Sequence, residues 1–498
     1  MDLRNYQEKA LEDLRSSMRK GNKRILLVAP TGSGKTVIAS AMIHLAMEKS
    51  LNCLFVAHRR ELVMQCSDKL RNFDVNHGVI MSGKSESEFA KTQIASIQTF
   101  TIRNKKEDFI KPKADMIILD EAHRSVSTSF KKLIAEYPDA YVIGLTATPC
   151  RNDGKGLGNI YQDLVSCSNT KELTEKGYLV PNRIVAPTMP DLVGLKLMAG
   201  DYEKRGLNKR MNTPKLVGDL VTHWLRHAEN RPTVVFAVSV AHSRFIANMF
   251  NSNGIPAGHI DGKTDELERE QVLKDLNMGK IKVLSNCQVL TEGWDEPKVS
   301  CVILARPTKS YAMYLQMVGR SLRPFENKTD TLIIDHSGCV YEHGFPEDVP
   351  EWELTENVIK KPTNKKNLPI EKQPFSCVMC DTVYEPNKYN RECPNCGHVL
   401  TDIDKKVLIK QGRLIELPKE NCKPTIDKNN FYSQLLGYSI EKKYKQGWAD
   451  WTFKEKFGHF PHTKKVYPRP ITDEVKGFII HLQIKKNKQK RYINVGTI

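Results

Sequence analysis

Residues 26–45 constrain the fold of this chain more than any other segment. The apolar run LLVAP at 26–30 predicts a buried strand, and the glycine-rich segment TGSG at 31–34 follows it directly. Apolar side chains then return at the spacing of a helix, at Val37, Ile38, Ala41, Met42 and Leu45. A strand that passes through such a loop into a helix is typical of parallel α/β sheets, where the amides that open the helix can bind anions.

The same alternation continues over much of the chain. Further apolar runs predict strands at 54–58, 116–120, 141–145, 233–239, 282–286, 299–305 and 331–335. Segments of helical period separate them, which favours parallel sheets covered by helices on both faces. Because the runs form two groups, we expect two α/β domains, 1–168 and 169–345, the second with a helical insert at about 190–230.

After residue 345 the composition changes. The stretch KKPTNKKNLP at 360–369 is polar, basic and proline-containing, which predicts a linker over 346–370. A cysteine-rich segment at 371–402 and a basic region at 403–498 follow. Residues 361–498 hold 27 Lys and Arg against 14 Asp and Glu, so +13 of the net charge of +18 lies there. Such an excess indicates a polyanionic partner, nucleic acid rather than a membrane surface.

Neither a membrane span nor a signal segment is expected. The apolar runs are far shorter than the ~20 residues of a membrane helix, and the first residues, MDLRNYQEKALEDL, have no apolar core. Eight of the twelve cysteines are scattered singly, which does not suit a disulfide scaffold. A reducing cytoplasm is therefore the expected compartment.

The glycine-rich loop has the residues of a nucleotide phosphate site. The backbone of Thr31, Gly32, Ser33 and Gly34 would curl around the phosphates of ATP. Lys35 would reach the β and γ phosphates, and the Thr36 hydroxyl would bind Mg²⁺. The general pattern begins with glycine, whereas Ala29 stands there in this chain. A glycine-rich turn without function is the alternative.

The segment DEAH at 120–123 ends the apolar run before it. Asp120 can hold Mg²⁺ through water, and Glu121 can orient and deprotonate the attacking water. Both would lie at the carboxyl edge of a sheet, where open α/β sheets bind ligands. Alone, the two acids could simply cap a helix, but together with the phosphate loop they predict ATP hydrolysis.

Five segments in order resemble the motifs of superfamily 2 helicases. They are PTGSGKT, DEAH, TATP at 146–149, LTEGWDEP at 290–297 and QMVGRSLRP at 316–324. Within that superfamily the chain resembles most the RadD-type bacterial DNA-repair helicases and their phage relatives, through the leading LRNYQ, the form VGRSLRP and four clustered cysteines. The resemblance spans about residues 1–345 and implies two RecA-like domains that clamp ATP, in the cytoplasm of a bacterial or phage-infected cell.

The resemblance also implies roles at the ATP site. Arg4 and Gln7 would lie near the adenine, and Gln316, Arg320 and Arg323 match the last motif. The two arginines would reach the γ-phosphate as fingers, which contribute about 10³–10⁵ in rate. The alternatives are a solvated Gln7 and an arginine that pairs with a carboxylate of the core.

Two further motifs would couple the ATP site to movement and to nucleic acid. Gly293 and Asp295 would connect nucleotide with nucleic acid, and Thr146 and Thr148 would link hydrolysis to domain movement.

Nucleic acid would cross both domains and be held by its backbone, with little base specificity. The matching residues are His58, Arg59, Gln98, Thr99, Ser239 and His242. A solvated helix start is the alternative for the first two. The forms DEAH, TAT and QMVGR depart from the RNA-helicase pattern, so DNA, single-stranded or forked, is favoured over RNA.

The spacing of four cysteines predicts a zinc ribbon. Cys377 and Cys380 form one CxxC pair, and Cys393 and Cys396 form the other. Gly397 suits the tight turn of the second pair. Four free thiols or a redox pair are the alternative. Zinc would supply much of the folding free energy, on the order of 10 kcal/mol in isolated fingers.

The C-terminal region interleaves lysines with aromatic residues. Tyr444, Trp448 and Trp451 fall at helical spacing, which favours the apolar stripe of a packed helix, with base stacking as the alternative. The run KKNKQKR at 485–491 is either a phosphate contact or a solvated charge run. A protein partner at the ribbon or at this region stays open.

The sequence thus predicts an ATP-dependent DNA helicase or translocase, in which nucleic acid stimulates hydrolysis and hydrolysis drives movement along DNA in replication, repair or recombination. The alternatives are a translocase motor of a restriction-type or remodelling complex and an RNA helicase. A nucleotide-gated DNA clamp with little turnover is disfavoured because Lys35, Glu121, Arg320 and Arg323 are all present.

Overall fold

The computed structural model divides into two compact units, Met1–Glu416 and Leu417–Ile498, which are described separately. No helix in the described parts of the chain is long and apolar enough to cross a membrane. The described residues are 3–87, 89–151, 154–187, 190–198, 200–348, 352–357, 374–386, 391–400, 407–410, 413–416, 428–445, 447–457, 459–461, 466–472, 475–476, 478–479 and 482.

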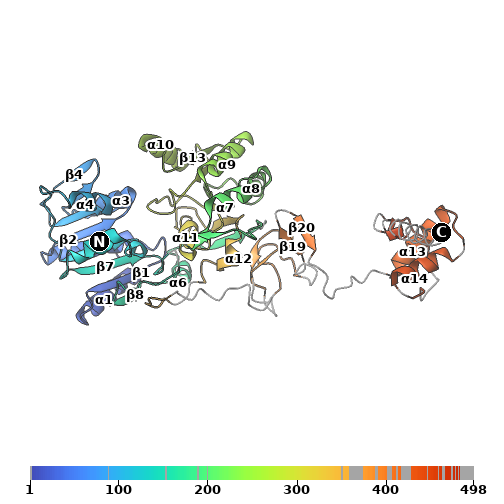
Figure 1. The fold of residues 1–498 in the computed structure, drawn as a ribbon, viewed down its shortest axis with the longest axis horizontal. Helices are drawn as coiled ribbons and strands as arrows, with labels where there is room; N and C mark the ends of the chain where they lie inside the picture. Colours follow the sequence, from blue (N-terminus) through green and yellow to red (C-terminus); the bar gives the residue numbers. More distant parts are fainter. Residues whose placement is uncertain are drawn as a thin grey trace, which may run out of the picture. The chain divides into compact units, whose positions relative to one another are not determined.

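The first unit begins with an α/β domain built on an eight-stranded sheet of order β4-β3-β5-β2-β6-β7-β1-β8 (Figure 1). All its pairs are parallel except β3 with β4. The strands are β1 Arg24–Val28, β2 Cys53–Ala57, β3 Gly78–Met81, β4 Lys84–Glu86, β5 Thr92–Ser96, β6 Met116–Asp120, β7 Tyr141–Thr146 and β8 Asp163–Ser166.

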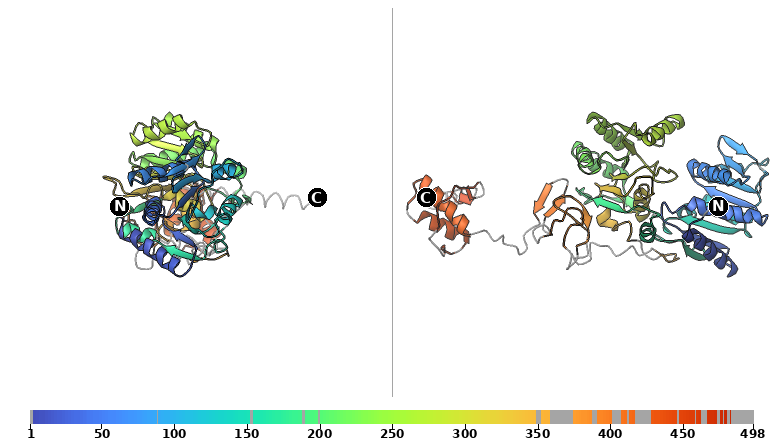
Figure 2. Two further views of the ribbon diagram at one scale, coloured as in Figure 1. Left: turned by 90° about the vertical axis from the view of Figure 1, so that its left-hand side faces the viewer. Right: turned by 180° about the vertical axis from the view of Figure 1, so that it is seen from behind.

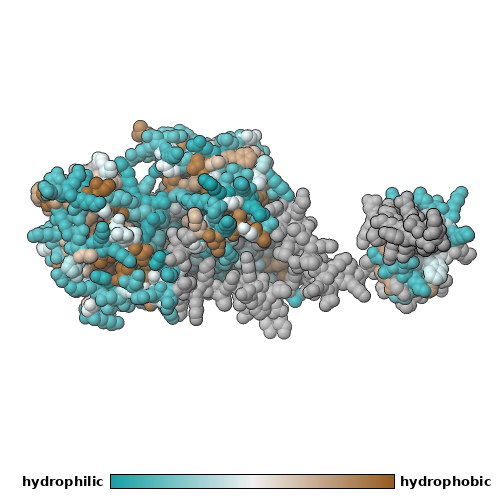
Figure 3. Space-filling view, viewed as in Figure 1, coloured by the Kyte–Doolittle hydropathy of each residue, from teal (hydrophilic) through white to brown (hydrophobic). Residues whose placement is uncertain are grey.

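Helices cover both faces of this sheet because the central strands are apolar on both sides. One apolar cluster joins the sheet to α1 Asn5–Arg19, α2 Lys35–Glu48 and α3 Arg60–Asn72. A second cluster on alternate strand residues joins it to α4 Ile97–Arg103 and α5 Thr128–Ala135. The outer surface of the α/β domains is mostly hydrophilic on the face seen in Figure 3.

A second α/β domain follows, on a six-stranded parallel sheet of order β13-β14-β12-β15-β16-β9. Its strands are β9 Asn182–Val185, β12 Thr233–Phe236, β13 Ala257–Ile260, β14 Val283–Asn286, β15 Cys301–Leu304 and β16 Thr331–Asp335. Its helices are α8 Pro214–His227, α9 Val240–Ser252, α10 Glu266–Asn277, α11 Tyr311–Val318 and α12 Cys339–His343, and α6 Thr170–Glu175 lies between the two sheets in sequence. Two parallel-sheet α/β domains are therefore confirmed.

The segment expected as a helical insert contains α7 Lys204–Met211 and α8. It also contains a short hairpin of β10 Leu197–Met198 and β11 Asp201–Tyr202, which apolar periodicity could not reveal over two-residue strands.

The described part of the predicted linker is bound rather than free. Residues 352–357 return to the first domain, where the amides of Gly156 and Gly158 each donate a 2.9 Å hydrogen bond to this segment. A Cβ on Gly156 would lie 2.0 Å from the Thr355 carbonyl oxygen, so the approach requires glycine there. The Trp352 ring lies 6.3 Å from the ring of Tyr311 in the second domain. Residues 358–373 lie outside the described part.

The cysteine-rich segment adds to the edge of the second sheet. Its hairpin of β17 Phe375–Ser376 and β18 Val383–Tyr384 leads to a bridge between Thr382 and Val185 of β9, and the Ala186 amide donates to the Asp381 carbonyl at 3.1 Å. Arg226 and His227 of α8 lie 3.3 Å from the Asp381 carboxylate. A hairpin of β19 Val407–Lys410 and β20 Arg413–Glu416 ends this first unit.

The C-terminal unit contains α13 Lys428–Glu441 and α14 Trp448–Phe457 around a small aromatic core that includes Phe431 and Phe453 (Figure 2). The predicted aromatic stripe is divided. Tyr444 lies between the helices and packs on Trp448, with ring centroids 4.6 Å apart, whereas Trp451 is 61% exposed. The run at 485–491 lies outside the described residues.

Candidate functional site

The loop between β1 and α2 is held in a curled conformation. Gly32 and Gly34 have φ of 87° and 82°, a left-handed region that glycine enters without steric cost. The Ser33 carbonyl accepts hydrogen bonds from the Tyr6 hydroxyl at 2.8 Å and from Gln7 Nε2 at 3.1 Å. Helix α1 thus fixes the loop, and the first amides of α2 open toward it.

A cavity of about 660 Å³ lies over this loop, between the two α/β domains. Its size suits a nucleotide. The sequence-predicted residues that line it are Arg4, Gln7, Thr31, Gly32, Gly34, Lys35, Thr36, Asp120, Glu121, Gly293, Asp295, Arg320 and Arg323. Gln316 is buried on α11 and does not line the cavity, and Ser33 contributes to the loop through its carbonyl.

Opposite charges face each other at the floor of the cavity. Burial and the neighbouring Glu121 raise the pKa of Asp120 to about 7, and burial lowers the pKa of Lys35 against the attraction of both acids. Glu121 has φ of 51°, a strained conformation for a non-glycine residue that occurs preferentially at functional sites. A carboxylate and the Thr36 hydroxyl are hard oxygen ligands that fit Mg²⁺.

The second domain adds two arginines to the cavity. Arg320 is buried and donates hydrogen bonds to the carbonyls of Thr291, at 2.7 Å, and of Trp294. Arg323 pairs with Asp295, which is the alternative that the sequence left open for one of the arginines, although this carboxylate is half exposed. Burial and the nearby Arg323 lower the pKa of Arg320 to about 10. Both guanidinium groups therefore line the cavity while bound to the loop at 291–295.

Tyr178 lines the same cavity and was not found from the sequence. The Arg4 guanidinium lies 4.7 Å above its ring, and the Tyr6 ring lies 5.1 Å away. This aromatic ring stands beside Arg4 and Gln7, where the adenine is expected, and it could stack on a base. A lone tyrosine in the connection between two sheets carries no periodic signal, so only the fold reveals it.

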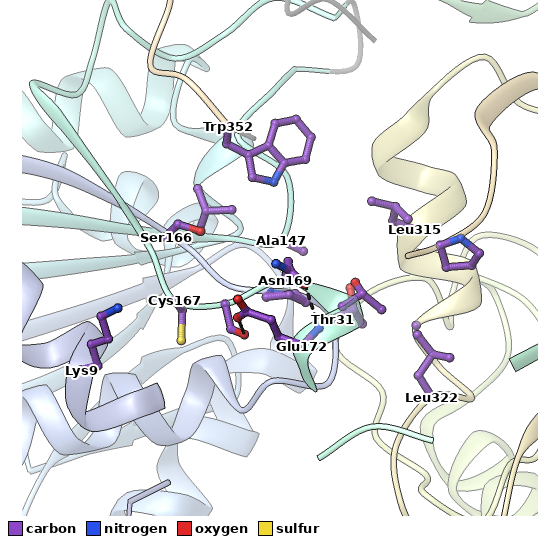
Figure 4. A pocket seen from close by; sticks show the side chains of 16 residues that line it. Lys9, Thr31, Ala147, Ser166, Cys167, Asn169, Glu172, Leu315, Leu322 and Trp352 are labelled. Atoms are coloured by element: carbon purple, nitrogen blue, oxygen red, sulfur yellow. Dashed lines mark hydrogen bonds between the residues drawn. The ribbon is translucent and has the colours of Figure 1, made fainter. Parts of the chain in front are cut away.

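The two domains lie close together at Thr31. A Cβ on Gly319, directly after α11, would lie 2.4 Å from the Thr31 Cβ. A second cavity, of about 250 Å³, also meets Thr31 and lies between Ser166 and Cys167 of the first domain and Leu315 and Leu322 of the second (Figure 4). The loop is therefore enclosed by the second domain.

Two family models match the chain. The model described as the res subunit of type III restriction enzymes matches residues 1–151, and the helicase conserved C-terminal domain matches residues 214–324. A 51.5 kDa protein of a Lactococcus phage is 30% identical over 399 residues, which are 80% of this chain and 83% of the phage protein. This chain belongs to the superfamily 2 helicases.

Other relatives of this helicase are more distant or longer. The Saccharomyces cerevisiae protein named putative ATP-dependent helicase IRC3 is 31% identical over 68% of the chain, which spans only 52% of the yeast protein. The Sulfurisphaera tokodaii protein named DNA 3'-5' translocase XPB2 is 25% identical over 65% of the chain and 79% of its own length. A subgroup of RadD type stays a prediction.

The fold is shared with a solved structure. A fragment of a putative HsdR subunit of a type I restriction enzyme from Vibrio vulnificus gives a TM-score of 0.57 at 22% identity, over 70% of this chain and 67% of the fragment. The likeness concerns the two-domain fold alone. The two family models and the relatives show that the helicase is an ATP-hydrolysing enzyme, and the cavity between its domains is the candidate site.

His58 and Arg59 of the helicase contact the second domain. His58 Nε2 lies 2.8 Å and Arg59 Nε 3.1 Å from Glu292 Oε2, and Arg59 also donates to the Val289 carbonyl at 2.8 Å. Both side chains are therefore bound to the second domain in this conformation, although 23% of the Arg59 side chain stays exposed, and their role as nucleic-acid contacts stays a prediction. Spacing alone could not show this because the partner lies more than 200 residues away.

The other predicted nucleic-acid contacts differ in exposure. Gln98 is exposed and donates to the His58 carbonyl at 2.8 Å, and Thr99 is half buried. Ser239 caps α9, since its hydroxyl accepts from the His242 amide at 3.0 Å. His242 is 1% exposed, and burial lowers its pKa to about 4, so its side chain stays neutral and cannot reach nucleic acid here. The cap that Ser239 forms at the start of α9 explains, without any bound ligand, why serine stands at 239.

The Thr146 and Thr148 side chains are both buried at the end of β7. The Thr146 hydroxyl donates to the Thr148 carbonyl at 2.8 Å, so the pair shapes the turn that follows the strand. Ala147 between them lines the small cavity shared by the domains.

The four predicted cysteines form one cluster. Their sulfur atoms all lie within 4.8 Å of one another, with Cys377 to Cys396 at 3.6 Å and Cys380 to Cys393 at 3.7 Å. Zn–S bonds of about 2.3 Å in a tetrahedron place sulfurs roughly 3.8 Å apart, so the donor set fits zinc. Gly397 has φ of 72°, as the knuckle turn requires.

We expect Gly319→Ala to separate the second domain from the phosphate loop. The added methyl group would meet Thr31, so kcat/KM for ATP should fall about tenfold or more, at a stability cost of roughly 1–3 kcal/mol for overpacking. Steady-state ATPase assays and denaturant unfolding measure both effects.

The matched control is Gly218→Ala in α8, where an added Cβ meets nothing within 4 Å. It should keep the ATPase and raise stability by about 0.5–1 kcal/mol, because alanine favours a helix. Wild-type activity in Gly319→Ala would contradict the close approach.

Removal of metal from the cysteine cluster should loosen the edge of the second sheet. We expect one zinc per chain by elemental analysis, and faster hydrogen exchange at the Ala186 amide after chelation, because its acceptor belongs to Asp381. The amides between β16 and β15 are the internal control and should stay protected. Metal-free protein with full protection at Ala186 would contradict a zinc ribbon.

Proposed function

We propose that this helicase is a DNA-stimulated ATPase that moves along DNA and separates or remodels it. The observation that carries the proposal is the interdomain cavity, in which Lys35, the Asp120–Glu121 pair, Arg320 and Arg323 converge. Hydrolysis at such a cavity depends on both domains and therefore links chemistry to their relative movement.

The side chains divide the work of hydrolysis. Lys35 and the amides of the loop would bind the phosphates, and Asp120 and Thr36 would hold Mg²⁺, which neutralises phosphate charge when bound. Glu121 would accept the proton of the attacking water. For Arg320 and Arg323 to reach the γ-phosphate, they must leave their partners at 291–295, so ATP binding would free that loop.

The names of the relatives support DNA as the nucleic acid on which this helicase acts. One matching model describes a restriction-enzyme subunit, and one relative carries the name DNA 3'-5' translocase. The chain's net charge of +18 agrees with a nucleic-acid partner. Membership of the RadD-type subgroup and a cytoplasmic location belong to this proposal as well.

The deciding experiment is the ATPase rate with single-stranded DNA, duplex DNA, forked DNA and RNA, beside an unwinding assay on tailed duplex. Stimulation by DNA together with unwinding supports a helicase. Stimulation without unwinding supports a translocase motor of a restriction-type or remodelling complex, and stimulation by RNA alone overturns the proposal.

The C-terminal unit supports a second DNA contact. Residues 417–498 hold 17 Lys and Arg against 7 Asp and Glu, a net charge of +10. Trp451 and Phe460 are 61% and 45% exposed with ring centroids 5.3 Å apart, and Lys454 Nζ lies 5.0 Å and 4.5 Å from the two rings. Exposed rings beside lysines suit stacking of unpaired bases.

Glu121→Gln should abolish hydrolysis but keep ATP binding, because the attacking water loses its base while Asp120 still holds the cation. Lys35→Ala should weaken nucleotide binding itself. Fluorescent nucleotide titration and phosphate release separate the two effects, and wild-type turnover in Glu121→Gln would refute the assignment of the base.

Truncation after Glu416 should weaken DNA binding and flatten its salt dependence while basal hydrolysis persists. Each lost phosphate contact removes about 0.9 from the slope of log K against log salt on duplex and about 0.7 on single strands. Trp451→Ala in the full chain is the matched comparison, and it should weaken single-strand binding without changing the slope, because stacking releases no ions. An unchanged slope in a folded truncated chain would favour a protein-docking role for this unit.

A further inference from the structure

The proposed hydrolysis assigns no role to Glu292, a buried carboxylate at the domain interface. Glu292 belongs to the loop between β14 and β15 of the second domain and is 5% exposed. Two other residues of the same motif, Gly293 and Asp295, line the ATP cavity, whereas Glu292 does not. A buried carboxylate is costly unless cations surround it, so its partners show what it is for.

All the charged partners of Glu292 come from the first domain. His58 Nε2 lies 2.8 Å and Arg59 Nε 3.1 Å from Oε2, at the end of β2. Arg124 Nη2 lies 3.1 Å and 3.2 Å from the two oxygens, and His123 Nε2 lies 3.8 Å from Oε1. The carboxylate therefore joins two separate segments of the first domain.

The charge of Glu292 is fixed by these neighbours. Burial alone would raise the pKa of its carboxyl, but the His58 hydrogen bond and the charges of Arg124, His58 and Arg59 outweigh burial and hold the pKa below its ordinary value. The second domain thus places a negative charge, that of Glu292, among basic residues of the first domain. We call these residues, His58, Arg59, His123 and Arg124, the basic cluster.

His123 connects this cluster with Glu121, the expected base of ATP hydrolysis. His123 is 7% exposed, and its Nδ1 lies 3.4 Å from Glu121 Oε2 while its Nε2 faces Glu292. The imidazole thus stands between the carboxylate of the expected base and a carboxylate of the other domain. Withdrawal of the second domain would remove one of the two acids that flank this ring.

We propose that Glu292 is a positioning residue for hydrolysis, which orients His123 against Glu121 only when the two domains are closed. The inference rests on the proposed ATPase and deepens it, because it names the contact through which closure reaches the base. Since Glu292 also binds His58 and Arg59, the same carboxylate ties the segment after β2 to the ATP site.

The test compares Glu292→Gln with wild type in the full chain at saturating DNA. A lost orienting charge should lower kcat about 10- to 100-fold, a part of the 10²–10⁴ that a general base contributes. The affinity for a non-hydrolysable ATP analogue should stay within about twofold, because Glu292 does not line the cavity. Glu292→Asp keeps the charge and should restore part of kcat.

The matched control is Arg269→Gln. Arg269 of α10 lies 3.0 Å from Glu61 of α3 and joins the same two domains without contacting the cluster around Glu292. It should leave kcat close to wild type. An equal loss of kcat in both variants would show that Glu292 only holds the domains together and would overturn the proposal.

A double-mutant cycle gives a second readout. If Glu292 acts through His123, the double variant of Glu292→Gln with His123→Asn should lose no more kcat than the single variants. Multiplied losses would overturn the proposal, and His123→Asn alone should show the same kcat loss with unchanged analogue affinity if Glu292→Gln does not fold. A wild-type chain without ATPase would overturn the proposed function and this inference together, whereas the control and the cycle bear on this inference alone.

Discussion

Positive charges that both domains place around one cavity constrain the arrangement of the two domains. Lys35 comes from the first domain and Arg320 and Arg323 from the second, and Lys35 and Arg320 are buried enough that their pKa values fall. Such a cluster is stable only with anions nearby. Asp120, Glu121 and Asp295 supply part of the compensation within the described chain, and a triphosphate would supply the rest.

The contacts of the loop at 291–295 explain why the cavity can respond to a ligand. The arginines are bound to carbonyls and to Asp295 of the loop at 291–295, and Gln65 donates to the Gly293 carbonyl of the same loop at 2.7 Å. A ligand that attracts the arginines therefore competes with the contacts that hold this loop. Coupling between nucleotide and loop requires such differential contacts in two states.

Local signals made the α/β core and the ATP site predictable. The apolar run at 116–120 coincides with β6, and the phosphate loop lines one cavity with Asp120 and Glu121 because parallel strands bring their carboxyl ends together. Long-range contacts were not predictable. Tyr178 lines the cavity from the segment that connects the two sheets, and His58 contacts Glu292 across the domain interface. Neither of these contacts follows from the spacing of residues in the sequence. For the same reason the return of residues 352–357 to the first domain was missed.

That return explains how the domains can move without separating. Two segments next to crossings between the domains border the small cavity, namely Ser166 to Thr170 at the end of β8 and Trp352 in the returning segment (Figure 4). The pairs Arg60–Glu266 and Glu61–Arg269 join α3 with α10, which lie away from α6 in Figure 1. The Arg60–Glu266 pair joins exposed side chains and is weak, at about 0–1 kcal/mol, whereas the covalent connections are permanent. A hinge at the side of these connections would let the side with α3 and α10 open, and such opening would also have to break the buried contacts of Glu292 with His58 and Arg59.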